Sequence, residues 1–256
     1  MYSLSKMGQL TQANQLFEQA YQLRLKALGS LNVDVAVTRL NFARTERDLG
    51  HFKIADIALV EVVSVFETLF PEQDMPHPAM AFALSEYGIS LRMQGRNIEA
   101  VKVFDRASLI SNTLAKSVVF GPLRERAMAW LALEKTQEAL ADIDVCLVQA
   151  AKLPPGQMIV PLAGCQWRAA QIHLSLGNLS VAHELNAKAL DGYRTIDLAL
   201  VSQTLEKAQA LVLQMRIAQV QGQNTVAQDA RAQAKSLLQP LQEYWLAQQL
   251  IKQLDQ

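Results

Sequence analysis

The sequence predicts an all-α protein, and three observations carry this prediction. Ala and Leu, both strong helix formers, are the commonest residues, whereas aromatic residues make up 6% of the chain and only 11 Gly and 8 Pro are present. Apolar residues recur at helical spacing in stretches of about 15 residues that tight-turn residues separate. This arrangement also repeats along the chain, which is typical of a helical solenoid.

A buried alanine is expected to mark each repeat, because it follows the turn residue by five positions throughout the chain. The turn residues lie 39 to 45 residues apart, and each is flanked by two amphipathic stretches, so each unit is predicted to be helix, turn, helix. A small side chain at this position would let two antiparallel helices approach closely. The turn and alanine pairs are Gly8 and Ala13, Gly50 and Ala55, Gly95 and Ala100, Glu134 and Ala139, Gly177 and Ala182, and Gly222 and Ala227.

The repeats predict a single domain over 1–256, with six units and a final capping helix over 240–255 that covers the last apolar face. The side chains that this capping helix buries are expected to be those of Tyr244, Trp245, Leu246, Leu250 and Leu254. Prolines, Pro161 among them, are expected between units or at helix starts, never at a helix centre. The predicted units are 1–30, 31–75, 76–115, 116–156, 157–196 and 197–238.

The passages LKALGSLNVDVAVTRLNFARTERDLGHF and PHPAMAFALSEYGISLRMQGRNIEAVKVFDRA, which lie between Leu25 and Ser111, carry a family resemblance. They resemble tetratricopeptide (TPR) repeats, in the long variant of kinesin light chains. The resemblance implies a right-handed superhelical solenoid that binds proteins or peptides without catalysing a reaction. Glu134 stands where this family usually has Gly, and Asn186 and Arg231 stand where it usually has an aromatic residue.

Charge and cysteine content exclude several protein classes. With 24 basic and 24 acidic residues the chain is neutral, so we expect no nucleic-acid partner. No apolar run is long enough for a membrane span, and the first residues do not resemble a signal peptide. Cys146 and Cys165 are too few for a disulfide framework and lack metal-site spacing, so we expect a cytoplasmic location, with Cys165 a partly buried thiol.

Catalytic chemistry is not predicted. A catalytic site needs a nucleophile, a base and a stabilising group that converge, or a metal centre. Cys165 and His173 lie on one predicted helix without a nearby carboxylate, and His51 and His77 fall in a turn and a linker. We therefore expect no enzymatic activity, no cofactor and no metal ion.

A concave groove lined by the first helix of each unit is the predicted binding site. Counting from the turns gives a set rich in arginine and poor in carboxylates, which we hypothesise binds an acidic segment of a partner, with Trp167 as an apolar anchor. The alternative is that each arginine is solvated and paired locally, as Arg44 and Asp48 would be at i and i+4. By resemblance, Asn41 matches an asparagine that contacts the ligand backbone in kinesin light chains. The candidates are Asn41, Arg44, Arg47, Arg92, Arg124, Trp167, Arg168 and Arg216.

We predict, as the leading hypothesis, that the protein is an interaction module of a larger bacterial-type signalling protein, such as a serine/threonine kinase or a transcriptional regulator. The helix before Gly8 is short, and this favours further sequence before Met1, whereas a reading frame that begins at Met1 would favour a stand-alone adaptor. An alternative is a signal-peptide receptor whose superhelix changes curvature on binding. Self-association through exposed Ala-rich and Leu-rich faces is a third hypothesis.

Overall fold

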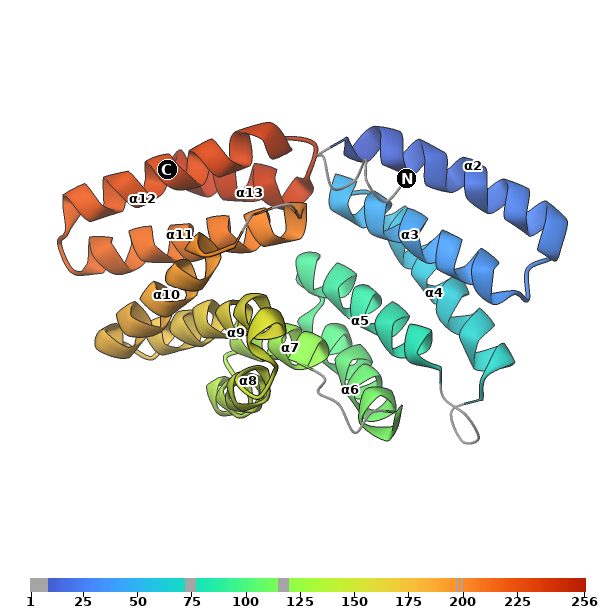
Figure 1. Cartoon of the computed structure of the whole chain (residues 1–256), viewed down its shortest axis with the longest axis horizontal. Coiled ribbons are helices and arrows are strands. Elements are labelled where there is room, and N and C mark those ends of the chain that lie inside the picture. Colours follow the sequence, from blue (N-terminus) through green and yellow to red (C-terminus); the bar gives the residue numbers. More distant parts are fainter. Residues whose placement is uncertain (1–8, 72–76, 115–119, 197, 199) are drawn as a thin grey trace. The chain divides into compact units, whose positions relative to one another are not determined.

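The computed structural model describes residues 9–71, 77–114, 120–196, 198 and 200–256 (Figure 1). In these ranges all the regular structure is helical, as predicted. The helices form two compact units, Gln9–Glu134 and Lys135–Gln256, and each is described here by itself. The first predicted turn, at Gly8, lies outside the described residues. The single-domain interpretation and the predicted unit boundaries stay predictions.

The first unit is a row of helices in which each packs against the next one along the chain (Figure 1). The first helices of successive repeats also contact one another, α3 with α5 and α5 with α7. This arrangement places side chains from three repeats on one face. The helices are α2 (Leu10–Leu28), α3 (Val33–Leu49), α4 (Phe52–Leu69), α5 (Pro78–Met93), α6 (Asn97–Leu114) and α7 (Phe120–Ala132).

The second unit continues the helix pairs, with sequential contacts from α8 to α12, and α13 packs against α11 and α12. The capping helix is shorter than predicted, because a 3-10 turn at Gln239–Leu241 precedes it. Of the side chains predicted to be buried here, Tyr244, Leu250 and Leu254 are buried, while Trp245 and Leu246 are half-buried. The helices are α8 (Thr136–Ala150), α9 (Pro155–Ser175), α10 (Leu179–Arg194), α11 (Val201–Val220), α12 (Asn224–Leu238) and α13 (Trp245–Leu254).

The marker alanines are core residues, as the repeat predicts. Five of them have no exposed surface, and Ala227 is 6% exposed. Each lies in the first turns of a second helix. The fully buried five are Ala13, Ala55, Ala100, Ala139 and Ala182.

The described turns between the helices of a repeat use a left-handed backbone. Gly50 has φ 88°, and the amides of Gly50 and His51 donate to the carbonyls of Arg47 and Glu46 at 2.9 and 2.8 Å, which ends α3. Glu134, at the turn that departs from the family pattern, takes the same conformation with φ 60°. A side chain in this region costs about 1–2 kcal/mol, so the turn geometry is kept against the preference of the residue.

The expectation that Cys165 is a partly buried thiol is wrong. Cys146 in α8 and Cys165 in α9 form a disulfide and are completely buried. Cysteine usage therefore gives no support to a reducing compartment.

The expectation for Pro161 is also wrong, because this residue lies inside α9. Helix α9 begins at Pro155, earlier than the sequence suggests, so Pro161 is past its first turn. Since proline has no amide hydrogen, one hydrogen bond of the helix is missing there.

Gly88 offers a test of the packing within a repeat. A Cβ atom at this position would lie 2.5 Å from Cε1 of Phe104, a ring that is completely buried and has no room to move. Gly88→Ala should lower the free energy of unfolding by about 1–3 kcal/mol, measured by denaturant unfolding of the full chain. Gly121→Ala is the matched control, because a Cβ atom there meets nothing within 4 Å. Equal stability of the two variants would contradict this packing.

Candidate partner-binding face

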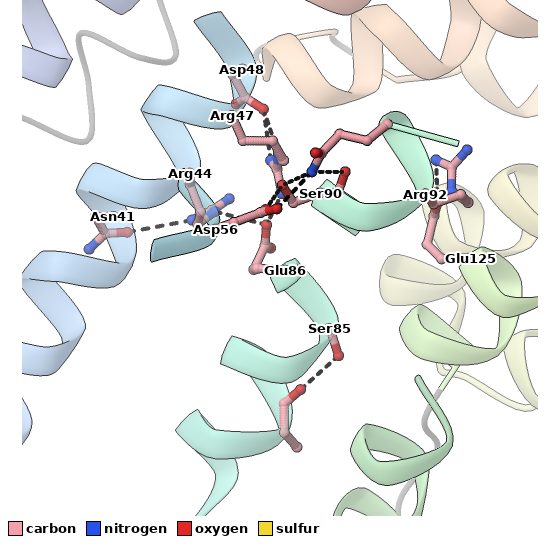
Figure 2. Close-up of polar contacts among 12 residues, drawn as sticks. Asn41, Arg44, Arg47, Asp48, Asp56, Ser85, Glu86, Ser90, Arg92 and Glu125 are labelled. Carbon is pink, nitrogen blue, oxygen red and sulfur yellow. Dashed lines mark hydrogen bonds and ion pairs between the residues drawn. The ribbon is translucent and has the colours of Figure 1, made fainter. Parts of the chain in front are cut away.

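The candidate site is the surface of unit 1 where the first helices α3, α5 and α7 lie in sequence, and we call it the first-helix face. It carries Asn41 and Arg44 from α3, Ser85 and Arg92 from α5, and Arg124 from α7. Figure 2 shows the arginines of α3 directed toward Glu86 of α5, and Arg92 beside Glu125 of α7.

Glu86 is the centre of the polar contacts between α3 and α5. Its carboxylate accepts a hydrogen bond from Nη1 of Arg47 and lies 3.4 Å from Nε of Arg44. The side chains of Glu86 and Arg47 are only 8% and 9% exposed, so this is a buried ion pair. Asp48 also accepts from Nη2 of Arg47, at 2.7 Å. The contacts join repeats two and three.

The environment of Glu86 favours its ionised form. Burial alone raises the pKa of this carboxyl, but the charges of Arg44 and Arg47 and the hydrogen bond from Arg47 together outweigh burial, so the pKa is lowered. A buried charge that has lost its partners would be very costly. Glu86 is therefore a permanent anion of the folded protein near neutral pH.

Glu125 repeats this arrangement one repeat further along. Oε2 of Glu125 lies 2.7 Å from Nη2 of Arg92, and Oε1 lies 3.9 Å from Nε of Arg124. The Glu125 side chain is 7% exposed. One buried glutamate thus stands next to two arginines at each of two successive repeat junctions.

Three of the arginines keep part of their surface in solvent. The side chains of Arg44, Arg92 and Arg124 are 29%, 27% and 25% exposed, enough to contact a partner while their glutamates hold them in place. The Arg44 guanidinium also lies 5.3 Å from the ring centroid of Phe82, a residue that is 45% exposed. Asn41 accepts a long hydrogen bond of 3.5 Å from Arg44. The face therefore offers fixed cationic donors beside an aromatic surface.

Other predicted site residues are less open than expected. Arg47 is 7% exposed because it forms the buried pair with Glu86. In unit 2, Trp167 is 3% exposed and packs with Ala163 and Tyr193, so the expectation of an open groove anchor is wrong.

Arg168 and Arg216 belong to unit 2 and differ from each other in exposure. Arg168 is buried over the Trp167 ring, donates to the carbonyl of Gly164 at 2.9 Å and pairs with Glu206. Arg216 is exposed on α11. A binding role for these residues stays a prediction.

The sequence-based interpretation missed the carboxylates of this face. Arginines were expected to gather in the groove with few acids, yet Glu86 and Glu125 lie among them. The local pairing considered for Arg44 and Asp48 is replaced by pairing across repeats. A signal was present, since Glu86 and Glu125 each precede their turn residue by nine positions, while Arg47 and Arg92 each precede theirs by three.

Metal sites and membrane spans are both absent from the described ranges. There, His, Cys, Asp and Glu form no group of three or more that could hold a metal ion. No helix in the same ranges has both the length and the apolar character that crossing a membrane requires.

The comparisons with known proteins identify the fold. No family model matches the sequence, and no curated protein matches it either. Among solved structures, BtubC from P. vanneervenii has a TM-score of 0.64 at 17% identity, over 92% of each chain. TPR-like repeats of a kinesin light chain candidate from Podosopora anserina have a TM-score of 0.59 at 22% identity, over 74% of this chain and 89% of that one.

A third structure leads to the same result. PilW, a type IV pilus biogenesis factor, has a TM-score of 0.59 at 18% identity, over 94% of this chain and 97% of that one. At these identities the likeness shows the fold alone. The chain has the TPR fold, which confirms the sequence-based recognition of the repeats.

The lowered pKa of Glu86 predicts how stability depends on pH. A carboxyl whose pKa is lower in the folded state stabilises the fold above its unfolded pKa of about 4.3, and this contribution is lost as the pH falls through the folded value. Glu86→Gln should lower the free energy of unfolding by about 3–5 kcal/mol near neutral pH, and this difference should shrink as the pH falls below about 4. Denaturant unfolding across this pH range measures both effects.

Glu67→Gln is the control for this pH dependence. Glu67 pairs with Arg106 at 2.5 Å, but its side chain is 44% exposed, so its loss should cost about 0–1 kcal/mol. If Glu86→Gln were as mild as Glu67→Gln, the buried pair would not support the face.

Proposed function

We propose that this protein is a non-catalytic scaffold whose first-helix face binds a segment of a partner protein. The observation that carries the proposal is the row of half-buried arginines, Arg44, Arg92 and Arg124, contributed by three successive first helices. A repeat fold supports such binding because adjacent units present a continuous surface. The fold supports binding by analogy alone, and the residues of the face provide the chemical basis.

The chemistry of the face favours a partner segment with acidic residues. Arg44, Arg47, Arg92 and Arg124 carry four positive charges, whereas Asp48, Glu86 and Glu125 carry three negative ones, so the local excess is one positive charge. Long-range attraction is therefore modest. Recognition would depend on short hydrogen bonds from guanidinium groups that the glutamates already orient, which lowers the entropic cost of binding.

Phe82 adds an apolar component to the proposed recognition. Its ring is 45% exposed and lies beside the guanidinium of Arg44. A large side chain of the partner would cover this ring while a neighbouring carboxylate contacts the arginine. We therefore propose a segment that alternates acidic and apolar residues.

The wider setting of the scaffold rests on the sequence interpretation. We propose that it serves a bacterial-type signalling protein with a kinase or regulator domain, in the cytoplasm. The full reading frame tests this setting directly, because a frame without such a domain would exclude it. Sedimentation over a range of concentrations tests the separate hypothesis of self-association.

The double variant Arg44→Ala/Arg124→Ala tests the binding face without leaving a buried acid alone. Glu86 keeps Arg47 and Glu125 keeps Arg92, so the fold should be retained. The probe is an array of synthetic 12-residue peptides that vary in the number of Asp, Glu and aromatic residues. Peptides rich in acids should bind the wild type and lose at least about 10-fold in affinity for the variant, since a hydrogen bond to a charged group contributes about 1.5–3 kcal/mol.

Arg194→Ala is the matched control for this binding test. Arg194 is an exposed arginine on α10 of unit 2, with a side chain 76% exposed. It should leave peptide binding unchanged. Equal affinity of the wild type and the double variant would overturn the assignment of the face, and so would equal binding of neutral and acidic peptides by the wild type.

A further inference from the structure

The two cysteines lie at a pair of repeat positions that is also found at other junctions between repeats. Cys146 follows its turn residue, Glu134, by 12 positions, and Cys165 precedes the next turn residue, Gly177, by 12. The same two positions hold Val62 and Ala83 at an earlier junction, and Ala189 and Ala210 at a later one. Each of these pairs is buried within a single core cluster. A second helix therefore packs on the following first helix at this point.

The cysteine pair places a covalent bond at one of these contact points. Both cysteines are completely buried, and their Cα atoms lie 6.0 Å apart, within the range of ordinary disulfides. The bond closes a loop with a sequence separation of 19 residues between α8 and α9. The disulfide therefore links α8 covalently to α9 within unit 2.

Apart from Ile143, the apolar side chains that α8 buries are small. Its buried residues are Ala139, Asp142, Ile143, Cys146 and Ala150, among which Ile143 is the largest aliphatic side chain. By comparison, α4 buries Leu59, Val62, Val63 and Phe66. Residues 151–160, which lead from α8 into α9, are all exposed or half-buried. Elements with few buried apolar contacts open most readily.

Loss of the disulfide would change the packing as well as the covalent tie. Two thiols that are not bonded keep to van der Waals separations of about 3.5–4.0 Å, so they need more room than one disulfide. At the two corresponding positions the later junction has Ala189 and Ala210, and the earlier junction has Val62 and Ala83. Two thiols would therefore pack less well than the disulfide at this contact, and poorly packed sites are less stable.

We propose that the Cys146–Cys165 disulfide is a redox-dependent clasp that keeps α8 on α9, and that its reduction releases α8 while the rest of unit 2 stays folded. A dithiol reductant carries out the reaction by thiol–disulfide exchange. One of its thiolates attacks a cysteine sulfur and expels the other as a thiolate, and its second thiol then resolves the mixed disulfide. The protein gains two thiols, and the reductant becomes a disulfide. Because both sulfurs are buried, exchange follows a transient opening of α8.

Hydrogen–deuterium exchange with mass spectrometry tests this clasp on the full chain. The protein is compared after oxidation in a glutathione buffer and after treatment with dithiothreitol, with thiol alkylation to confirm each state. Peptides from 136–150 should exchange about 100-fold faster in the reduced protein, because closing a loop of this size contributes about 3 kcal/mol. Peptides from α12 and α13 should be unaffected.

The double variant Cys146→Ala/Cys165→Ala is the matched control. It recreates the alanine pair of the later junction, so its exchange should not respond to dithiothreitol. Unchanged exchange in 136–150 on reduction of the wild type would overturn the proposal. Equal acceleration throughout unit 2 would also overturn it, and so would cysteines that stay alkylatable after oxidation.

Discussion

The close approach of neighbouring helices is the constraint on which the structure depends. In the pairs α3–α4, α5–α6, α9–α10 and α11–α12 the second helix packs closely on the first, and the marker alanines from Ala13 to Ala182 have no exposed surface. The alanines recur every 39 to 45 residues, so residues at the same offset from a turn have related surroundings. The candidate binding face and the disulfide both follow from this regularity.

The ion pairs between repeats recur at fixed offsets from the turns, and they form a polar surface on a helical scaffold with an apolar core. Arg47 and Arg92 lie three positions before their turns and pair with Glu86 and Glu125, which lie nine positions before the next turns. A buried pair of this kind adds little net stability, because desolvation opposes the attraction. Its benefit is orientation, since the glutamates hold Arg44 and Arg124 beside them as well. A surface that is already ordered needs to lose less entropy when a partner binds.

The sequence predicts the helices, the turns and the alanine contacts because each follows from local spacing. It also places Arg44, Arg92 and Arg124 on one series of helices. The burial of Glu86 was not predicted, because it depends on which charge stands in the adjacent repeat, and carboxylates are usually exposed. Trp167 was expected in the groove from its distance to the turn residue, whereas contacts with Ala163 and Tyr193 place it in the core.

The disulfide, too, could not be predicted by considering one helix at a time. The number and spacing of the cysteines resemble no known framework, and only the comparison of offsets around Glu134 and Gly177 brings them together. Pro161 was expected in a linker because proline usually ends a helix, yet α9 continues through it. Both errors concern α8 and α9.

The central claim is that the guanidinium groups on α3, α5 and α7 contact the partner. Nuclear magnetic resonance of the full chain tests it most directly, by following the arginine Nε–H signals during titration with an acidic peptide selected from the array. The account predicts that the signals of Arg44, Arg92 and Arg124 shift together with the backbone amides of these three helices. Shifts confined to α4 and α6, or to unit 2, would contradict it.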